Sequence, residues 1–157
     1  DVKVLVEKAV AAREIEFAAL ENPEYGAAPL ISIAGEIIPQ HEFYSYDAKY
    51  LDENGAVLKI PADLDLKKMK EGQEMSAKIF QVLECEGMAR VDLFLDKNTN
   101  QYYFNEVNTI PGFTTISMYP KLWEASGLSY QDLLTRLIDL AVNRHERKAR
   151  LSRVYKE

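Results

Sequence analysis

The chain has 157 residues, of which 47% are hydrophobic and 28% are charged, and its formal net charge is −6. This composition is ordinary for a single globular domain, here residues 1–157, that is large enough to bury a core. The negative charge argues against a nucleic-acid binder, and no apolar run approaches the roughly 20 residues of a membrane span. Cys85 is the single cysteine, so no internal disulfide can form, and we expect a cytoplasmic protein.

The first part of the chain predicts strands and a long loop. Residues 2–10 are rich in Val and Leu and favour a buried strand, while residues 13–22 alternate like a strand with two distinct faces. Residues 29–40 predict a hairpin that turns at Ala34-Gly35. Residues 41–64 keep no regular period, which is typical of a long ordered loop with short strands, and such loops are often functional.

The second part mixes helices with a stronger hairpin. Residues 65–86 have the apolar spacing of an amphipathic helix, and residues 89–96 and 101–108 predict two strands joined by a turn. Residues 120–127 predict a short helix, and residues 129–148 predict a long helix that begins at a serine N-cap. We therefore predict an α+β fold, with an antiparallel sheet from the two hairpins backed by the first and last of these helices.

Polar side chains gather on one face of the second hairpin. Strand alternation places Arg90 and Asp92 together on one strand, and Phe104, Glu106 and Asn108 together on the next. A turn centred in the connecting loop sets Asp92 opposite Glu106 and Arg90 opposite Asn108. Facing carboxylates repel unless a cation lies between them, and an all-oxygen set without His or Cys suits Mg²⁺. The alternative is an exposed sheet face on which Arg90 neutralises both acids.

A Pro-Gly pair directly after this strand favours the cation site. Gly112 lets the backbone approach a ligand closely and offers an unhindered N–H donor. Donors of this kind stabilise anions in many acyl-transfer sites. Both features point to a site that binds a cation and a developing negative charge together.

Three segments resemble the C-terminal part of the D-alanine–D-alanine ligases, a family with the ATP-grasp fold. They are "EFYSYDAKY" (42–50), "RVDLFLD" (90–96) and "FNEVNTIPGFTTISMYPKLWEASGLSY" (104–130), and the likeness runs from about Val4 to residue 147. The resemblance implies the C-terminal lobe of an ATP-grasp enzyme with a lid loop. It also implies ATP-dependent ligation of two D-alanines, through an acyl phosphate, to D-alanyl-D-alanine for peptidoglycan synthesis.

The resemblance assigns the metal and oxyanion roles to the hairpin and its loop. Asp92, Glu106 and Asn108 are expected to hold two Mg²⁺ ions, with Glu106 bridging them and Mn²⁺ able to substitute. Arg90 and the backbone N–H of Gly112 are expected to stabilise the oxyanion of the tetrahedral intermediate. These roles agree with the chemistry that the residue types favour on their own.

The nucleotide roles fall on the start of the chain and on the lid loop. By resemblance, Glu7, Lys8 and Val10 line the adenine, Glu14 holds the ribose hydroxyls, and Lys49 reaches an ATP phosphate. Taken alone, Glu14 is typical of a surface acid and Lys8 of a solvated lysine.

The remaining roles concern the second substrate and closure of the site. By resemblance, Ser117 and Met118 hold the carboxylate of the second D-alanine, and Tyr50 helps to close the lid over the substrates. Met118 suits core packing equally well, and Tyr44 and Tyr46 are expected to pack the loop against the sheet. The implied partners are ATP, D-alanine, the N-terminal half of the same enzyme and a second copy in a homodimer.

Several parts of the family are missing from residues 1–157. The sequence has no glycine-rich phosphate loop and begins within an expected strand, so we expect a fragment that is inactive alone. A ligase that makes D-Ala–D-lactate or D-Ala–D-serine is a close rival hypothesis, although Tyr50 within "AKYL" resembles the dipeptide-forming type. A non-catalytic module that binds nucleotide or metal is a further hypothesis, and a structural or interaction role is the last.

Overall fold

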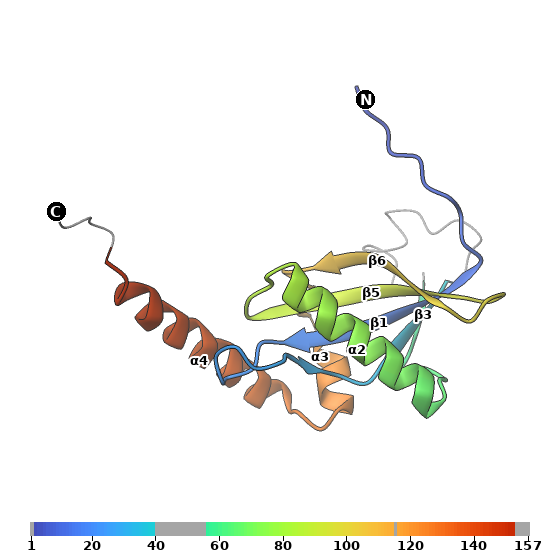
Figure 1. Ribbon diagram of the computed structural model, residues 1–157. Helices are drawn as coiled ribbons and strands as arrows, with labels where there is room; N and C mark the ends of the chain where they lie inside the picture. The colour runs from blue at the N-terminus through green and yellow to red at the C-terminus, as the bar shows by residue number, and fades with distance from the viewer. Residues whose placement is uncertain (1, 40–55, 115, 153–157) are drawn as a thin grey trace.

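The computed structural model describes residues 2–39, 56–114 and 116–152, and these residues are organised around one antiparallel sheet (Figure 1). Its strands are β1 (Ala12–Leu20), β2 (Leu30–Ile31), β3 (Gly35–Pro39), β4 (Ala56–Lys59), β5 (Met88–Asp96) and β6 (Tyr102–Asn108). The order across the sheet is β4-β3-β1-β5-β6, and β2 pairs with the end of β1. Strand β1 is therefore central, with β3 on one side and β5 on the other.

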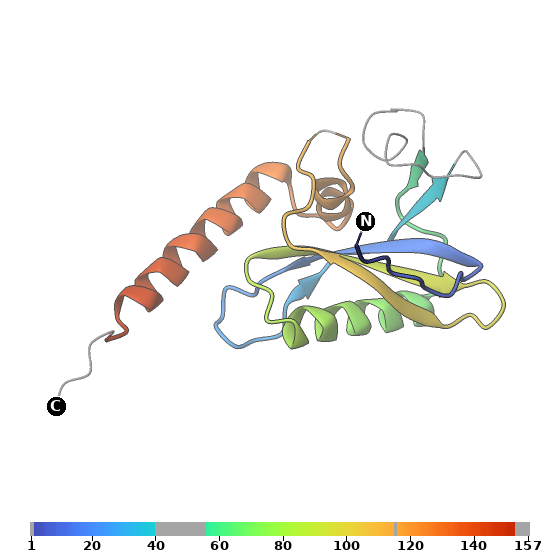
Figure 2. The ribbon, with the colours of Figure 1, turned by 90° about the horizontal axis from the view of Figure 1, so that it is seen from above.

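The described helices are α2 (Leu66–Val82), α3 (Met118–Ala125) and α4 (Tyr130–Ala149). Helix α2 covers one face of the sheet and α3 lies against the opposite face, as the two views show (Figures 1 and 2). Helix α4 follows α3 and runs away from the sheet toward the C-terminus. Among the helices of the described ranges, none is long and apolar enough to cross a membrane.

Helix α2 packs closely on the sheet. Asp65 caps its first turn by accepting a hydrogen bond from the backbone N–H of Lys68 at 2.7 Å. Its half-buried apolar residues pack against a core cluster that includes Ile15, Phe17, Val91 and Leu93. Gly72 permits the close approach, because a Cβ atom there would lie 2.5 Å from the Phe17 ring.

The opposite face carries a second core beneath α3. Its buried members come from the sheet, from α3 and from α4: Ala18, Leu20, Ile37, Met118, Tyr119, Leu122, Trp123, Leu133 and Leu140. The Tyr119 hydroxyl donates a hydrogen bond to the Ala19 carbonyl at 3.0 Å, so its polar group is satisfied. Burial raises the pKa of Tyr119.

A partly buried ion pair lies on the α2 face. The Arg13 guanidinium donates two hydrogen bonds of 2.7 Å to the Glu36 carboxylate, and a third of 2.9 Å to the Asp63 carbonyl. Glu36 is the cross-strand partner of Ile15, which places the pair on the same side as α2. The hydrogen bond from Arg13 lowers the pKa of Glu36, although burial alone would raise it.

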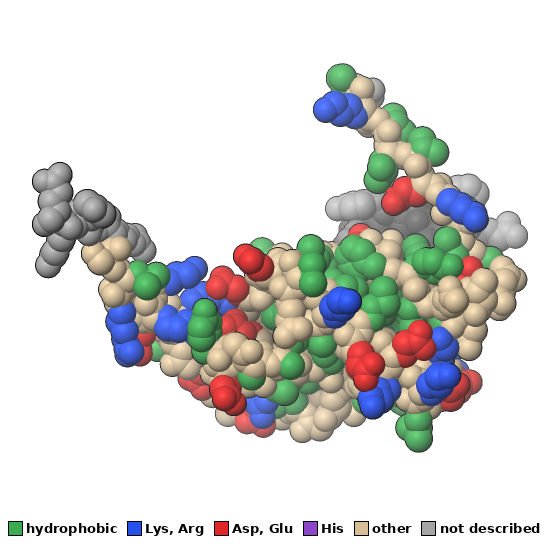
Figure 3. Space-filling view, in the orientation of Figure 1, with side chains coloured by type: hydrophobic (Ala, Val, Ile, Leu, Met, Phe, Trp, Pro, Cys, Tyr) green, Lys and Arg blue, Asp and Glu red, His purple; other side chains and the backbone are tan. Residues whose placement is uncertain are grey.

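Two strand predictions are wrong. Residues 2–10 form no strand: the segment leaves the body of the molecule with its hydrophobic side chains uncovered (Figure 3). Among the described residues no strand pairs with this segment, and β1, with which it is continuous, is already paired on both sides. The expected hairpin at residues 29–40 is instead two short strands, β2 and β3, which pair side by side with β1 and not with each other.

Most of the predicted elements in the rest of the chain are confirmed. The helices and the second hairpin are confirmed, and β4 is a short strand within the expected loop, of which residues 40–55 lie outside the described residues. Helix α4 is confirmed at its predicted N-cap, where Ser129 accepts a hydrogen bond from the Asp132 N–H at 3.1 Å. However, α4 does not back the sheet, because α3 occupies that face. It buries Leu133 and Leu140, and Arg144 binds Glu21 at 2.8 Å.

We expect Gly72→Ala to destabilise the protein by about 1–3 kcal/mol, because the added methyl overpacks the interface between α2 and the sheet. In an exposed helix interior the same change would stabilise by about 1 kcal/mol, so the sign of the effect tests the packing. Lys78→Ala, on the exposed side of α2, serves as the control and should change stability by less than about 0.5 kcal/mol. Urea unfolding measures the stability of both variants. A Gly72→Ala protein as stable as the unchanged protein, or more stable, would contradict the close packing.

Candidate functional site

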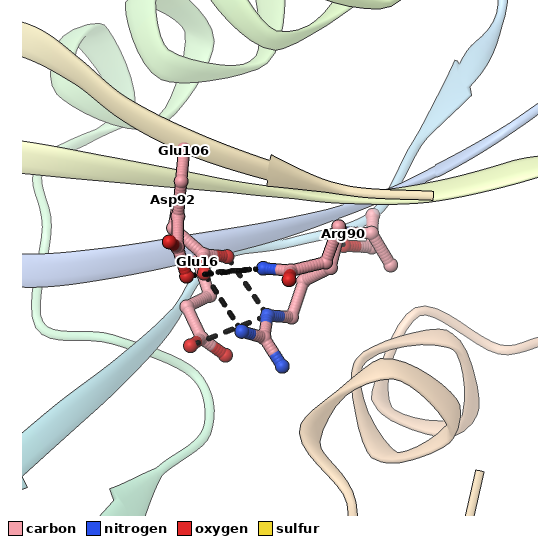
Figure 4. A network of polar contacts seen from close by, with 7 residues as sticks. Glu16, Arg90, Asp92 and Glu106 are labelled. Carbon is pink, nitrogen blue, oxygen red and sulfur yellow. Dashed lines mark hydrogen bonds and ion pairs between the residues drawn. The ribbon is translucent and has the colours of Figure 1, made fainter. Parts of the chain in front are cut away.

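Three carboxylates lie in a row across the face of the sheet that α2 leaves free. Glu16 on β1 is the cross-strand partner of Asp92 on β5, and Asp92 is the partner of Glu106 on β6. Cross-strand partners point to the same face of a sheet, and Figure 4 shows these side chains together. Glu16 and Asp92 are 2% and 0% exposed, whereas Glu106 is exposed at the edge. Burying two neighbouring carboxylates requires compensating positive charge.

Arg90 supplies that charge from the next position along the same face. Its Nε and Nη2 atoms donate to the two Asp92 oxygens at 2.8 and 2.7 Å, and Nε lies 3.3 Å from Glu16 Oε1. Burial alone would lower the pKa of Arg90. The hydrogen bond with Asp92 and the charges of Glu16, Asp92 and Glu106 outweigh burial and raise the pKa. The guanidinium is therefore a permanent cation fixed between two acids.

Asn108 completes the cluster from β6. Its amide nitrogen donates to Asp92 Oδ2 at 3.0 Å and to Glu106 Oε1 at 3.3 Å. The amide thus faces both predicted metal ligands. For its oxygen to reach a cation held by the same carboxylates, the amide group must rotate, a change that needs no movement of the strand.

The predicted pairing of the two strands is confirmed at the site and fails just beyond it. Asp92 faces Glu106 and Arg90 faces Asn108, as expected. A β-bulge follows, so Phe104 faces Leu93 and falls on the α2 side, not on the face of Glu106 as predicted. The extra residue of the bulge breaks strict alternation, and bulges are common next to active sites.

The hypothesis of an exposed, charge-neutralised sheet face is wrong in one respect. Arg90 does pair with the acids, but Asp92 is wholly buried and the Arg90 side chain is only 18% exposed. A surface ion pair contributes little, whereas a buried one is retained at a considerable desolvation cost. The arrangement is therefore a built cluster rather than a solvated face.

The loop after β6 approaches the same region through its backbone. Gly112 is exposed, and a Cβ atom there would lie 2.8 Å from Ser117 Oγ, so a larger residue would force the Ser117 side chain to move. Ser117 Oγ accepts a hydrogen bond from the Thr114 N–H at 3.0 Å, which ties the loop together. Ser117 is also the N-cap residue of α3, and its side chain makes no cap hydrogen bond there.

Met118 has its side chain in the core. It is 4% exposed, and a Cβ atom on Gly35 would lie 2.7 Å from its sulfur. Core packing, which the sequence left open for Met118, is therefore confirmed for the side chain. Only the backbone of Met118, at the first turn of α3, is available for a ligand.

The predicted nucleotide residues are not all brought together. Glu7 and Lys8 are exposed on the irregular N-terminal segment, and Val10 is half-buried at its end. Glu14 is half-buried on β1, on the same face as Glu16 and one row away. Lys49 and Tyr50 lie outside the described residues.

Glu16 is the residue of this cluster that sequence reasoning missed. The alternation of residues 13–22 sets Glu16 on the same face of its strand as Glu14, so a signal is present in the sequence. Its link to Asp92 depends on the pairing of β1 with β5, which joins segments about 75 residues apart and leaves no local pattern.

The residues fit a divalent cation. Three carboxylates and one guanidinium leave an excess of two negative charges on this face. In the parts of the chain that the structure covers, no three His, Cys, Asp or Glu side chains converge as ligands of one ion. Mg²⁺ does not require that, since it usually binds through one or two carboxylates together with substrate phosphates.

Comparison with known proteins adds the family. The model of the family described as D-ala D-ala ligase C-terminus matches residues 1–139. A D-alanine--D-alanine ligase from Shouchella clausii is 58% identical over 151 residues, covering 96% of this chain and 40% of that protein. D-alanine--D-alanine ligase A from Bradyrhizobium diazoefficiens is 52% identical, covering 99% of this chain and 41% of that protein. The chain therefore spans about two fifths of the length of these curated relatives.

Solved structures agree. The D-alanine-D-alanine ligase from Coxiella burnetii matches with a TM-score of 0.76 and 43% identity, over 91% of this chain and 35% of that one. A D-Ala:D-Ser ligase from Enterococcus faecalis matches with a TM-score of 0.71 and 34% identity, over 85% of this chain and 37% of that one. The predicted α+β fold, the C-terminal lobe of an ATP-grasp ligase, is confirmed by the observed sheet and these likenesses.

We expect Arg90→Gln to destabilise the protein by about 3–5 kcal/mol in the absence of divalent cations, because it leaves buried carboxylates without their cation. Adding Asp92→Asn to this variant removes one of those charges and should recover part of the loss. Urea unfolding in a chelating buffer measures both changes. If Arg90→Gln unfolds like the unchanged protein, the guanidinium does not compensate the buried acids.

Proposed function

Because the chain belongs to the D-ala D-ala ligase C-terminus family, we propose that it is the C-terminal part of a longer D-alanine–D-alanine ligase. In this proposal an N-terminal domain and a first ATP-grasp lobe lie outside residues 1–157 and form the other wall of the cleft. The whole enzyme joins two D-alanines at the expense of ATP, to give D-alanyl-D-alanine for peptidoglycan synthesis. The single cysteine and the need for ATP suit the cytoplasm.

The cluster of Arg90, Asp92, Glu106 and Asn108 carries this proposal. It combines acidic oxygens suited to Mg²⁺ with a guanidinium held 2.7–2.8 Å from one of the acids. A module that only bound a nucleotide would need the metal ligands, and the half-buried cation beside them would serve only to balance the buried acids. A ligase needs both, because it must neutralise phosphates and also stabilise a developing oxyanion.

The proposed reaction has two steps. The carboxylate of the first D-alanine attacks the γ-phosphate of ATP, which gives an acyl phosphate and ADP. The amine of the second D-alanine then attacks the acyl carbon, and phosphate leaves. Neither step uses a side-chain nucleophile, so catalysis rests on positioning and on neutralising charge.

The residues of this chain take distinct parts in that reaction. Asp92, Glu106 and Asn108 would hold two Mg²⁺ ions, or Mn²⁺, and the bound ions would offset the charge of the ATP phosphates. The Arg90 guanidinium and the Gly112 N–H would stabilise the oxyanion on the acyl carbon. Their support lies in the fixed position of Arg90 and the exposed glycine backbone beside Ser117.

The start of α3 suits the carboxylate of the second D-alanine. Backbone N–H groups at a helix N-terminus, together with the helix dipole, favour a negative group. Ser117 and the backbone of Met118 lie at this position, next to the loop that carries Gly112. We assign the carboxylate to these two residues, with the Met118 side chain serving only to hold the helix in place.

The nucleotide and the lid complete the proposal. We assign the adenine to the segment with Glu7, Lys8 and Val10, and the ribose to Glu14, which lies on the site face of β1. Lys49 would reach an ATP phosphate. Closure of the lid, to which Tyr50 belongs, would keep water from the acyl phosphate.

One observation supports D-Ala–D-Ser as an alternative product: the chain is similar to the D-Ala:D-Ser ligase from Enterococcus faecalis, at 34% identity. The likeness to two of the D-alanine–D-alanine ligases is greater, at 43% for the solved structure from Coxiella burnetii and 58% for the relative from Shouchella clausii. We therefore prefer the dipeptide of two D-alanines.

We expect the full-length protein to make D-alanyl-D-alanine as its main product when D-Ala, D-lactate and D-Ser compete at equal concentration with ATP and Mg²⁺. Mass spectrometry of the products and measurement of released phosphate follow the reaction. If D-Ala–D-Ser or the D-lactate depsipeptide predominates, the protein is a ligase of that type instead. Absence of any ligation would overturn the proposed function.

We expect the isolated chain of residues 1–157 to release no phosphate above background with ATP, Mg²⁺ and D-alanine, because half of the nucleotide cleft is contributed by the rest of the enzyme. For the same reason, calorimetry with ATP and Mg²⁺ should detect weak binding or none. Tight ATP binding without turnover would favour the non-catalytic module instead. Turnover by the isolated chain would contradict the division of the site between two parts.

A further inference from the structure

We propose that Glu16 is a positioning residue that holds the Arg90 guanidinium in place when the Asp92 carboxylate engages a cation. The inference rests on the proposed function and extends it by a residue that the proposed reaction does not otherwise use. Two binding partners compete for the Asp92 carboxylate. In the proposed function this carboxylate binds Mg²⁺, but both of its oxygens already accept hydrogen bonds from Arg90, at 2.8 and 2.7 Å.

The two demands on Asp92 cannot both be met in full. Mg²⁺ requires close oxygen ligands in near-octahedral geometry, so it draws a ligating carboxylate toward itself. A guanidinium bonded to both oxygens of that carboxylate would then follow it, lose a hydrogen bond or be repelled by the ion. A catalytic cation in that position needs a second anchor that does not bind the metal.

Glu16 has the geometry of such an anchor. Its Oε1 atom lies 3.3 Å from Arg90 Nε, and its carboxylate lies beside the guanidinium (Figure 4). It belongs to β1, whereas the predicted metal ligands belong to β5 and β6. Movement of Asp92 or Glu106 toward an ion therefore does not itself displace Glu16, which can keep hold of the guanidinium.

The surroundings of Glu16 keep it fixed. Its strand is paired on both sides, with Gly35 opposite it on β3 and Asp92 opposite it on β5. Met118 fills the space above Gly35, the neighbour of Glu16 on the side away from the metal ligands. A carboxylate that is 2% exposed and bounded in this way has little freedom to follow a solvated ion.

The charges support separate roles for Glu16 and for the two metal-binding carboxylates. With Asp92 and Glu106 neutralised by bound cations, Glu16 is the carboxylate that remains to balance Arg90. A buried guanidinium without a counter-charge would be repelled from the cluster. The Glu16 carboxylate thus keeps Arg90 at the sheet surface where the acyl carbon must be approached.

The test compares variants of the full-length enzyme. We expect Glu16→Gln to lower kcat by about 10- to 100-fold, the usual cost of losing an orienting partner, with the KM for ATP changed by less than about threefold. In an Arg90→Met background, adding Glu16→Gln should lower kcat by no more than about twofold, because the group that Glu16 positions is already gone. If Glu16→Gln lowers kcat by the same factor in the unchanged enzyme and in the Arg90→Met background, the proposal is wrong.

Glu36→Gln is the matched control. It removes a second buried carboxylate of the same sheet, which is 8% exposed and paired with Arg13 on the opposite face. Both variants should lose stability, but only Glu16→Gln should lose kcat. Equal kcat in Glu16→Gln and Glu36→Gln would assign Glu16 a structural role alone. An inactive unchanged enzyme would instead overturn the proposed function.

Crystal structures provide a readout apart from activity. In the unchanged enzyme with Mg²⁺ and ADP, Arg90 should stay within hydrogen-bond distance of Glu16, and in Glu16→Gln the guanidinium should be displaced. An Arg90 that leaves Glu16 when Mg²⁺ binds would overturn the proposal. Glu16→Asp carries the same test if Glu16→Gln does not fold: its charge is kept but its reach is one methylene shorter, so kcat equal to that of the unchanged enzyme would exclude positioning by contact.

Discussion

The site depends on one charged contact, the Arg90 guanidinium held between the buried carboxylates of Asp92 and Glu16. Such a cluster is weak evidence for stability, since apolar residues of similar volume often do as well or better in a sheet. Its presence on the two central strands is more easily explained by chemistry. A permanent cation and acids with surplus negative charge are placed together before any ligand arrives, so little reorganisation is needed during reaction.

The two faces of the sheet divide stability and function between them. The α2 face is closed by apolar packing and by the Arg13–Glu36 pair, which lies on the side of the sheet opposite the site. The other face is shared along β1: its end, at Ala18 and Leu20, lies under α3 as core, while its beginning carries Glu14 and Glu16. A strand that is buried at one end can present charged groups at the other without losing its place in the sheet.

Sequence reasoning succeeded where the determinants were local and failed where they were not. Asp92 faces Glu106 as alternation predicted, although a bulge between the turn and this pair contributes to that register, and the α4 cap followed from Ser129. Phe104 was misplaced because a bulge adds a residue that alternation cannot show. Residues 2–10 have the composition of a strand, but composition does not supply a partner. Glu16 was missed because its neighbours come from strand pairing across a long stretch of chain.

Met118 shows why a family resemblance and a structure answer different questions about one residue. The resemblance names Met118 as a contact for a substrate carboxylate, while its buried side chain packs over Gly35 and leaves only its backbone for that purpose. Gly35 in turn faces Glu16 in the row of carboxylates. The same side chain therefore fixes the start of α3, where an anion would bind, and closes the core beside the residue that steadies Arg90. The start of α3 and the row of carboxylates are therefore linked through one core contact, Met118 over Gly35.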